Sequence, residues 1–572
     1  MRLRVPKILE LPPLEGPSWR EYTLLALTLL IVFLACYQPL WDPDSFWHLA
    51  VGREIWQTHH LVRTETFSFS ALGHPWEDTE WLFHVVAYPL WKLGGDTLLC
   101  ILTTLLGVLA VGILYRCVRL LGGSAVDFAA YMLVMLFFYQ VRVRFRPEVA
   151  SLVLMAILVE ALLRWKPPPD RLGRFWIFSS IFFCFWAQVH GGWSYGLLLL
   201  GAVLAGHVLD ALRERRLSAR YLGYMALNGL APAAAVFINP YGWRIPWFPV
   251  KSLIGFLNPH LIQIEEWTHT PWHGIFLLFD AVCILLLIYL LVRYKRLTWV
   301  QWLWATSQVF LGLYWVRYTA FLVLTLVPAG VAAIRDASRV LRARRLVWGV
   351  ILFGVLVRCS YQYVNFTPDF NLTYKYPVQE ANFLKTHHIK GNLFNTYTVG
   401  GYLDWELYPL DRIFMDGRYY PFEKELVNYH KAYTSIPAYH KFLKKYPFDI
   451  VLYPYNNFYL KEKAAGGRKV SRGASVVLFP PKSWSLVYFG NYGMVLLKRE
   501  PRYQKIIKKF GYNAMRPDDL KYLVKEASAG RISSERLVEV IEAKLKKDPY
   551  IRIRGQLTKA LDQLKETHDK PE

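Results

Sequence analysis

The sequence predicts a polytopic α-helical membrane protein with a C-terminal α/β domain. The chain has 572 residues, of which 54% are hydrophobic and 16% aromatic, and its mean hydropathy is +0.20. Its first part repeats apolar runs of roughly 16–24 residues between short charged loops, and about 20 apolar residues are needed to cross a bilayer core. After Cys359, short β-rich runs alternate with helical patterns. This composition excludes an entirely soluble enzyme, a disordered chain and a disulfide scaffold.

The net charge of +24 is typical of a membrane protein with basic cytoplasmic loops, so it does not by itself indicate nucleic-acid binding. Six cysteines lie in or beside apolar runs, and Cys359 is the last of them. The C-terminal part can therefore form no intrachain disulfide and no cysteine-based zinc site.

The first apolar run, over residues 22–37, follows a basic N-terminal stretch but has no small-x-small cleavage site. We interpret it as an uncleaved first span. The apolar runs together predict about eleven spans, near 20–40, 97–120, 124–141, 149–165, 175–190, 193–211, 221–238, 274–293, 298–315, 317–335 and 345–361.

The distribution of basic residues predicts the orientation of these spans. Every second loop is basic: Arg116–Arg119, Arg164–Arg174, Arg213–Arg220, Arg293–Arg296 and Arg335–Arg345. Because cytoplasmic loops carry the excess of Lys and Arg, we expect a cytoplasmic N-terminus in a multi-pass protein of the cell membrane. The loops at 41–96 and 239–273, and everything after about 361, then lie outside the cytoplasm.

The long outside loops contain mixed polar and aromatic helical patterns at 45–58, 80–93 and 243–257, which predict interfacial helices. In the tail we expect strands at 393–395, 412–415, 449–453, 475–479 and 494–497, and helices at 377–388 and 421–446. The predicted domains are a transmembrane domain over 1–360, an extracytoplasmic α/β domain over 361–500 and a charged helical extension over 501–572.

Several arginines lie on the predicted outside, where they oppose the orientation bias: Arg142, Arg144 and Arg146 in one loop, Arg244, and Arg317 between two spans. The alternate placement of the first three suits a short extended segment, which would keep them on one side. One interpretation is a site for an anionic group, because Arg pairs well with phosphate. The alternative is contact with lipid headgroups by snorkelling side chains.

The strongest local pattern is Trp41-Asp-Pro-Asp-Ser-Phe-Trp-His-Leu49 after the first span. Its carboxylates, Asp42 and Asp44, could act as a general base or bind a metal, with His48 nearby. Alternatively, Asp44 or Ser45 caps the helix that follows. The two interpretations are compatible.

Other polar residues of the outside loops have both a structural and a functional interpretation. His190, before Gly191 and Gly192, is a packing residue or a ligand. Glu265, Glu266 and Glu80 are solvated loop charges or supporting residues of a site. In the tail, Gly400-Gly401 and Asp416-Gly417-Arg418 are a closely packed edge and a turn, or part of an acceptor site.

Several of these motifs resemble one family of polytopic membrane proteins. The matching stretches are Asp42–Arg53, Arg63–Ser70, Pro75–Leu82, Arg146–Glu148, His190–Gly192, Asn239–Gly242, Ile264–Trp267, Asn395–Tyr402 and Met415–Arg418. Over roughly residues 20–500 the chain is similar to an uncharacterised bacterial membrane family of the GT-C superfamily. That superfamily of glycosyltransferases includes protein O-mannosyltransferases and lipid A aminoarabinose transferases. The acidic pair here is Asp-x-Asp, whereas protein mannosyltransferases typically have adjacent acids.

The resemblance implies transfer of a sugar from a polyprenyl-phosphate carrier to a glycan, lipid or protein acceptor at the outer face of the membrane. Asp44 would be the base, and Asp42 would assist it or bind a divalent metal such as Mg²⁺ or Mn²⁺. Arg142, Arg144, Arg146 and Arg317 would bind the lipid phosphate. No nucleic-acid partner is expected.

Two other classes of function remain open at the level of sequence. A transporter or lipid flippase tends to carry intramembrane charges and broken helices near the midplane, whereas the charges here gather at one predicted face. A non-catalytic membrane scaffold could keep the fold, but it would not need the acidic pair and the outside arginines together.

Overall fold

The structure is a computed structural model, and it describes residues 18–168, 173–247, 249–250, 275–341, 375–418, 420–432, 435–455, 459–463, 469–513 and 515–568. The chain divides into two compact units. The helical unit comprises Met1–Leu40 and Glu77–Thr367, and the C-terminal unit comprises Trp41–Trp76 and Pro368–Glu572. Residues 41–76, expected within the transmembrane domain, thus pack with the tail.

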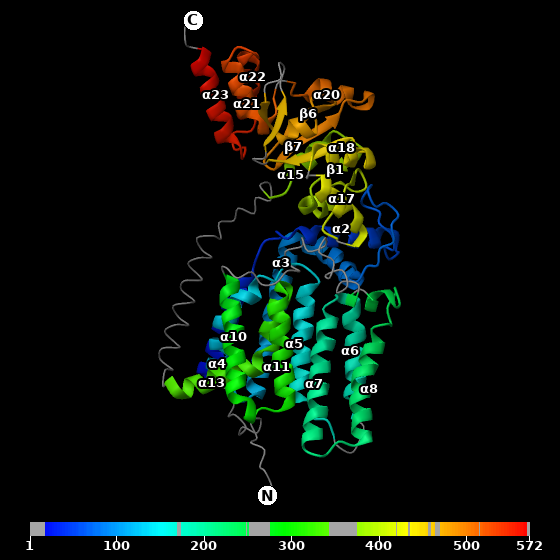
Figure 1. Cartoon of the computed structure of the whole chain (residues 1–572), viewed down its shortest axis with the longest axis vertical. Coiled ribbons are helices and arrows are strands. Elements are labelled where there is room, and N and C mark those ends of the chain that lie inside the picture. Colours follow the sequence, from blue (N-terminus) through cyan, green and yellow to red (C-terminus); the bar gives the residue numbers. More distant parts are fainter. Residues whose placement is uncertain are drawn as a thin grey trace. The chain divides into compact units, whose positions relative to one another are not determined.

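The helical unit is built from apolar helices, and α5 to α8 run side by side with α10 and α11 (Figure 1). Their bounds are α1 Trp19–Cys36, α3 Trp81–Leu120, α4 Ala125–Gln140, α5 Glu148–Arg164, α6 Phe175–Val189, α7 Trp193–Arg213, α8 Ala219–Ala235, α10 Ile275–Arg293, α11 Trp299–Tyr314, α12 Thr319–Thr325 and α13 Val327–Leu341. Ten of the predicted spans coincide with these helices, and the eleventh, at 345–361, lies outside the described residues.

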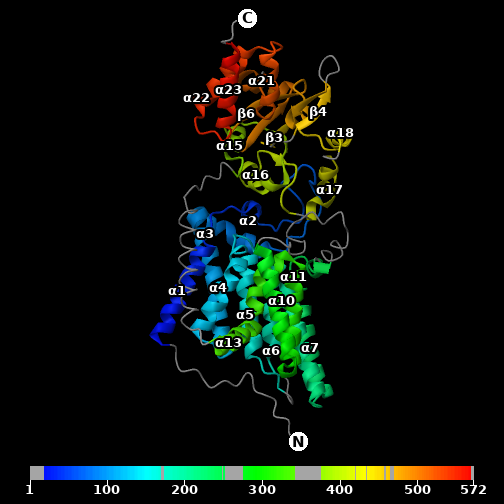
Figure 2. The same ribbon diagram turned by 60° about the vertical axis from the view of Figure 1, so that its left-hand side comes forward.

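Among the described residues, three helices (α1, α3 and α7) are long and apolar enough to cross a membrane. A fourth is added if the bent pair Val316–Thr325 and Val327–Asp336, which meets at 62°, counts as one span. This supports an integral membrane protein, while the count of eleven spans stays a prediction. The turned view in Figure 2 shows α1 and α4 along the same bundle.

The helix α3 contains two of the predicted elements. Gly94 and Gly95 have non-helical dihedral angles, and Gly95 has a φ of 59°, which favours glycine. This break separates the interfacial helix predicted at 80–93 from the span predicted at 97–120. The predicted interfacial helix at 45–58 is α2, Pro43–Thr58, in the C-terminal unit, and the one at 243–257 lies mostly outside the described residues.

The C-terminal unit contains a five-stranded mixed sheet in the order β2-β1-β3-β7-β6. β1 is parallel to β2 and to β3, and β7 is antiparallel to β3 and to β6. The strands are β1 Asn392–Phe394, β2 Arg412–Ile413, β3 Ile450–Pro454, β6 Trp484–Phe489 and β7 Gly493–Lys498, and a separate hairpin is formed by β4 Tyr459–Lys463 and β5 Lys469–Gly473.

The segment after α2 extends this sheet at its β2 edge. Ser68 forms a parallel bridge with Ile413. The N–H of Ile413 donates to the Phe67 carbonyl at 3.2 Å. The N–H of Phe69 donates to the Ile413 carbonyl at 3.0 Å, and the Ser70 hydroxyl donates to the carbonyl of Phe414. The Arg63–Ser70 motif is therefore an extra edge segment of a sheet that lies more than 300 residues later in the chain.

The helices of the C-terminal unit are α2, α15 Val378–Thr386, α16 Gly400–Leu407, α17 Glu423–Ala432, α18 Ile436–Lys445, α19 Ala474–Leu478, α20 Gln504–Phe510, α21 Leu520–Ser528, α22 Ser534–Lys547 and α23 Arg554–His568. The predicted helix at 421–446 is two helices, because Ser435 caps the second and Pro437 stands at its start.

The strand predicted at 475–479 is wrong, since these residues lie mainly in helix α19. The Asp518 carboxylate accepts from the N–H of Ser475 at 2.9 Å and from its hydroxyl at 2.6 Å. The distant Asp518 therefore accepts a backbone N–H at the start of this short helix. A contact with a residue so far along the chain cannot be predicted from a short apolar run.

The charged C-terminal extension shares the core of the sheet. Ile541 of α22 and Leu557 and Leu564 of α23 are fully buried in one apolar cluster with Phe489 and Met494 of the sheet. The helical prediction for 501–566 is confirmed, and by these contacts the extension packs as part of the α/β unit.

A buried acid in α15 predicts how stability depends on pH. Glu380 is fully buried, accepts the N–H of Gly493 at 2.9 Å and of Tyr492 at 3.1 Å, and burial raises its pKa to about 7. Since the folded state keeps a proton that the unfolded state releases, this stabilisation is full below pH ~4.5 and is lost as the pH rises through about 7. The difference is at most about 3 kcal/mol.

We therefore expect Glu380→Gln, which keeps the accepting oxygen, to raise the unfolding temperature at pH 8 and to leave it nearly unchanged at pH 5. Thermal unfolding of the full-length protein in detergent measures both values. Glu566→Gln, at an exposed position of α23, is the matched control and should change neither. Equal shifts for Glu380→Gln at both pH values would contradict the expectation.

Candidate functional site

Within the helical unit, His190 joins α6 to α7 and is held on the Nδ1 side of its ring. The Gly192 N–H donates to Nδ1 at 3.1 Å, and the Ser151 hydroxyl of α5 lies 2.8 Å from the same nitrogen. A Cβ at Gly192 would stand 2.7 Å from the Ser151 oxygen and 2.9 Å from Nδ1, whereas one at Gly191 would meet nothing within 4 Å. The second glycine of the His-Gly-Gly motif is thus needed for this close approach.

Charged side chains from two other elements face the Nε2 side of the ring. Glu80 Oε1, just before α3, lies 3.7 Å from Nε2, and Arg317 Nη2, between α11 and α12, lies 3.5 Å from it. Residues predicted from four separate loops therefore meet around one histidine. We call Glu80, Arg142, Arg146, His190 and Arg317 the His190 cluster.

The arginine loop between α4 and α5 belongs to this cluster, but it is not the extended segment that the sequence suggested. The N–H of Arg144 donates to the carbonyl of Arg142 at 3.0 Å, and that of Arg146 to the carbonyl of Arg144 at 2.7 Å, so the loop consists of successive three-residue turns. Val143 and Phe145 between them are buried, while Arg144 and Arg146 are half-buried. Arg142 is buried and pairs with Glu148 at 3.6 Å.

The electrostatics of the cluster are dominated by positive charge. His190 is buried, and the charges of Arg317, Arg146 and Arg142 act on its ring. A buried ring near three guanidinium groups favours an anion as the bound group.

A pair of potential metal ligands lies at the start of α3. The ligand atoms of Glu80 and His84 are within 4.8 Å of each other, and the residues are four apart, so they share one face of the helix. The buried Asp78 carboxylate lies 2.8 Å from His84 Nδ1, an arrangement common for metal-binding histidines. These two side chains could supply part of the coordination of a divalent cation.

The remaining predicted residues of the outside loops have separate positions. Arg244 pairs with Glu77 at 3.3 Å within the helical unit. His48 is buried on α2, with its ring 3.7 Å from that of Trp47. Glu265 and Glu266 lie outside the described residues.

In the C-terminal unit, the acidic pair has two different roles at the start of α2. Asp42 is the N-cap, since its Oδ1 accepts the N–H of Asp44 at 3.0 Å, so the expectation that Asp44 or Ser45 is the cap is wrong. Pro43 takes the first helical position because it needs no hydrogen-bond acceptor there, which places the cap on the residue before it, Asp42. Asp44 is half-buried in the first turn, where the helix dipole stabilises a carboxylate.

The two glycine motifs of the tail lie against the acidic pair. A Cβ on Gly417 would stand 2.2 Å from Oδ1 of Asp44, and a Cβ on Gly401 would stand 2.7 Å from the Pro43 carbonyl. A Cβ on Gly400 would stand 2.2 Å from the Met415 carbonyl. The Gly400-Gly401 pair thus allows α16 to begin in close contact with the Pro43 carbonyl and the Met415 carbonyl. The pair lies at the start of a helix and not at the strand edge that the sequence suggested.

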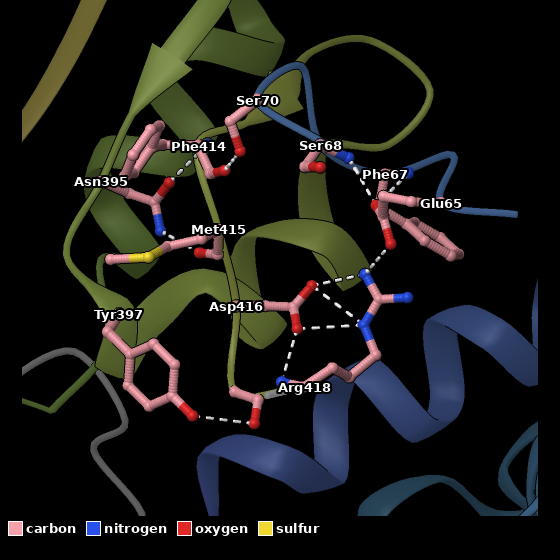
Figure 3. A network of polar contacts seen from close by, with 11 residues as sticks. Glu65, Phe67, Ser68, Ser70, Asn395, Tyr397, Phe414, Met415, Asp416 and Arg418 are labelled. Carbon is pink, nitrogen blue, oxygen red and sulfur yellow. Dashed lines mark hydrogen bonds and ion pairs between the residues drawn. The ribbon is translucent and has the colours of Figure 1, made fainter. Parts of the chain in front are cut away.

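The loop that carries Gly417 is anchored by a buried ion network (Figure 3). Arg418 binds the Asp416 carboxylate through Nε at 3.0 Å and Nη2 at 2.5 Å, and its Nη2 also lies 2.9 Å from Glu65. The guanidinium stands 4.6 Å from the centre of the Trp76 ring and 5.1 Å from that of Phe67.

Hydrogen bonds from residues just after β1 hold the other side of this loop (Figure 3). Asn395 donates to the Met415 carbonyl at 2.8 Å and accepts the N–H of Phe414 at 2.9 Å. The Tyr397 hydroxyl donates to the Gly417 carbonyl at 2.9 Å. The matching motifs of the tail and of the 41–76 segment therefore build one structure, with the Asp44 carboxylate beside Gly417.

The chain matches no known protein-family model, and no curated protein sequence matches it. By structure it is similar to the oligosaccharyltransferase of Archaeoglobus fulgidus in the apo form, with 10% identity, a TM-score of 0.49, and coverage of 76% of this chain and 70% of that chain. It is also similar to AglB of the same organism in complex with an inhibitory peptide and a dolichol-phosphate, with 11% identity, a TM-score of 0.47 and coverage of 79% and 74%. ArnT from Cupriavidus metallidurans bound to undecaprenyl phosphate is similar at 15% identity and a TM-score of 0.46, with coverage of 83% and 97%.

Proposed function

We propose that this protein is a glycosyltransferase that takes a sugar from a polyprenyl-phosphate carrier and transfers it to an acceptor hydroxyl at the outer face of the membrane. The observation that carries the proposal is the convergence of Arg142, Arg146 and Arg317 on one buried histidine in a unit of apolar helices. The apolar helices suit a prenyl chain, and the guanidinium groups suit its phosphate.

In the proposed reaction, the acceptor oxygen attacks the anomeric carbon of the sugar as the bond from that carbon to the phosphate oxygen breaks. The phosphate leaves with the electron pair, and the arginines stabilise its negative charge. The Asp44 carboxylate accepts the proton of the acceptor hydroxyl. Asp42 is assigned to holding α2, because its side chain already caps the helix.

A divalent cation is a further part of the proposal. Glu80 and His84, at the start of α3 in the helical unit, are its candidate ligands. When bound, such an ion would stabilise negative charge on the leaving phosphate.

Binding of polyprenyl phosphate to the purified full-length protein tests the donor half of the proposal. We expect Arg146→Gln and Arg317→Gln to weaken binding by about tenfold or more, as a charge-assisted hydrogen bond contributes roughly 1.5–3 kcal/mol. Native mass spectrometry or microscale thermophoresis in detergent gives the affinities. Arg213→Gln, at the other end of α7, is the matched control and should bind normally.

Polyprenol without its phosphate should bind much more weakly than the phosphate, and high salt should weaken only the phosphate complex. Unchanged affinity in both arginine variants would leave these side chains as contacts to bulk lipid headgroups and would overturn the proposed phosphate site.

A further inference from the structure

A concentration of positive charge in the C-terminal unit involves none of the residues of the proposed reaction. It is formed by the end of α15, by α20 and by the last turn of α22. Burial lowers the pKa of His387, and the charges of Lys509, Lys547 and His388 lower it further, so these three groups lie close to its ring. Asp548, which follows Lys547, is engaged by a buried lysine one turn earlier in α22.

Two aromatic rings lie among these cations. The ring centre of His387 is 4.5 Å from that of Phe510 in α20 and 4.8 Å from that of Phe383 in α15. Lys509 Nζ stands 5.0 Å from the centre of the Phe510 ring. His387 and Phe510 are half-buried, which leaves part of each ring at the surface. A ligand at this surface therefore meets rings and cations together.

The short helix α20 extends the positive charge. Lys505, Lys508 and Lys509 are exposed and lie three and four positions apart, so they share one face of the helix. Like charges at this spacing destabilise a helix, so the pattern is not explained by stability. We call these residues, with His387, His388, Phe510 and Lys547, the α20 surface.

His388 occupies a backbone position that glycine would fill with less strain, since its φ is 48°. The N–H of His388 donates to the Lys385 carbonyl and that of Ile389 to the Leu384 carbonyl, both at 3.1 Å. These two bonds define the turn after a helix in which glycine is the usual residue. The His388 side chain is exposed, so packing does not account for a histidine here. An exposed imidazole held in a strained position favours a role in binding.

The chemistry of the α20 surface favours an acidic sugar chain over a membrane surface. Helices that bind a bilayer expose apolar side chains among their cations. In α20, by contrast, Ile507 is buried, and Ile506 and Phe510 are half-buried. Because aromatic faces carry partial negative charge, the C–H groups of sugar rings pack on them. Repeated acid groups along a chain match cations that are spread over three elements.

We propose that the α20 surface binds an acidic glycan, a sugar chain with repeated carboxylate or phosphate groups. The lysines bind the acid groups, His388 donates a hydrogen bond, and the rings of His387 and Phe510 contact a sugar ring. This inference goes beyond the proposed function and does not depend on it, because binding is measured without sugar transfer.

The test is calorimetric titration of the purified full-length protein, in neutral detergent, with an oligomer of galacturonic acid. We expect binding that high salt abolishes, and no binding of a glucose oligomer of equal length. The double variant Lys509→Gln with Lys547→Gln should weaken binding about tenfold, as each exposed ion pair contributes at most about fivefold. Lys441→Gln with Lys444→Gln, at exposed positions of α18, removes the same charge and is the matched control.

His388→Gly separates binding from stability. Glycine adopts a positive φ without strain, so the unfolding temperature should stay the same or rise. Binding of the galacturonic acid oligomer should nevertheless weaken by about two- to tenfold, the range for one hydrogen bond. Unchanged affinity in this variant would overturn the part assigned to His388. Unchanged affinity in the double lysine variant of the α20 surface, or an equal loss in the α18 control, would overturn the whole inference.

Two further ligands test the class of partner. An oligomer of glutamic acid represents an acidic protein segment, and dihexanoyl phosphatidylglycerol represents an anionic lipid headgroup. We expect both to bind more weakly than the galacturonic acid oligomer, and tighter binding of either would overturn the assignment to a glycan. All variants of the α20 surface should bind polyprenyl phosphate normally, so failure of this inference and failure of the proposed function are separate results.

Discussion

Replacing Asp44 with asparagine is expected to give a folded protein that transfers sugar about 10²–10⁴ times more slowly, the usual contribution of a general base. The side chain keeps its size, and Asp42 rather than Asp44 caps α2, so the free energy of unfolding should fall by less than ~1 kcal/mol. Release of polyprenyl phosphate from a panel of polyprenyl-phosphate-linked sugars, followed by thin-layer chromatography, measures the rate. Parental turnover by folded Asp44→Asn would remove Asp44 from the mechanism.

Two neighbouring variants separate chemistry from structure. Asp42→Ala should lower stability by about 1 kcal/mol through loss of the cap while leaving more activity than Asp44→Asn. Gly417→Ala leaves both acids in place, but its Cβ would stand 2.2 Å from the Asp44 carboxylate and must displace it. We therefore expect Gly417→Ala to fold and to be strongly impaired, and normal activity in this variant would show that the position of the carboxylate is unimportant.

Replacing Arg418 with methionine should produce the largest loss of stability. The change leaves Glu65 and Asp416 buried without their cation, and loss of one partner from a buried ion network typically costs about 3–5 kcal/mol. Thermal unfolding and limited proteolysis of the C-terminal unit measure the effect. Lys441→Met, on the exposed face of α18, is the control and should change the unfolding temperature little.

The loss should be partly reversed at low pH. The buried Asp404 of α16 is close enough to this network to feel its charges. Burial raises the pKa of Asp404, the Asp416 charge raises it further and the Arg418 charge lowers it. Burial also raises the pKa of Glu65 even with Arg418 present. Groups with a raised pKa in the folded state stabilise it below their unfolded pKa and lose that effect as the pH rises. Arg418→Met should therefore be closer to wild type at pH 5 than at pH 8. An equal deficit at both values would show that packing of the guanidinium, rather than its charge, is what matters.

Periodicity was sufficient to predict the helices of the first unit. Apolar runs of span length with charged ends specify a helix whatever surrounds it, so ten expected spans coincide with helices of this unit. Short elements of the tail were less predictable. The short apolar run at 475–479 has the pattern of a strand. Its helical start depends on Asp518, 43 residues away, which the local pattern does not contain.

The sequence predicted which residues belong to the candidate site, but not how they are arranged in space. The arginines were singled out because they oppose the orientation bias, and His190 because it ends a span, yet nothing in their spacing shows that Arg317 lies 3.5 Å from His190. Ser151 was missed altogether, since a serine within an apolar helix carries no distinguishing pattern. The same holds for Glu65, whose partner Arg418 is 353 positions later in the chain.

The pairing of residues 41–76 with the tail also restricts how the chain can thread through a bilayer. Ser70 and Phe414, 344 positions apart, belong to one compact unit, so both must end on the same side. A chain returns to its starting side only after an even number of crossings. Ten of the predicted spans fall between these two segments, which satisfies this parity, and adding or losing a single span there would leave the sheet and its edge segment on opposite sides. From the edge contact at Ser68 we therefore expect an even number of membrane crossings between residues 76 and 375.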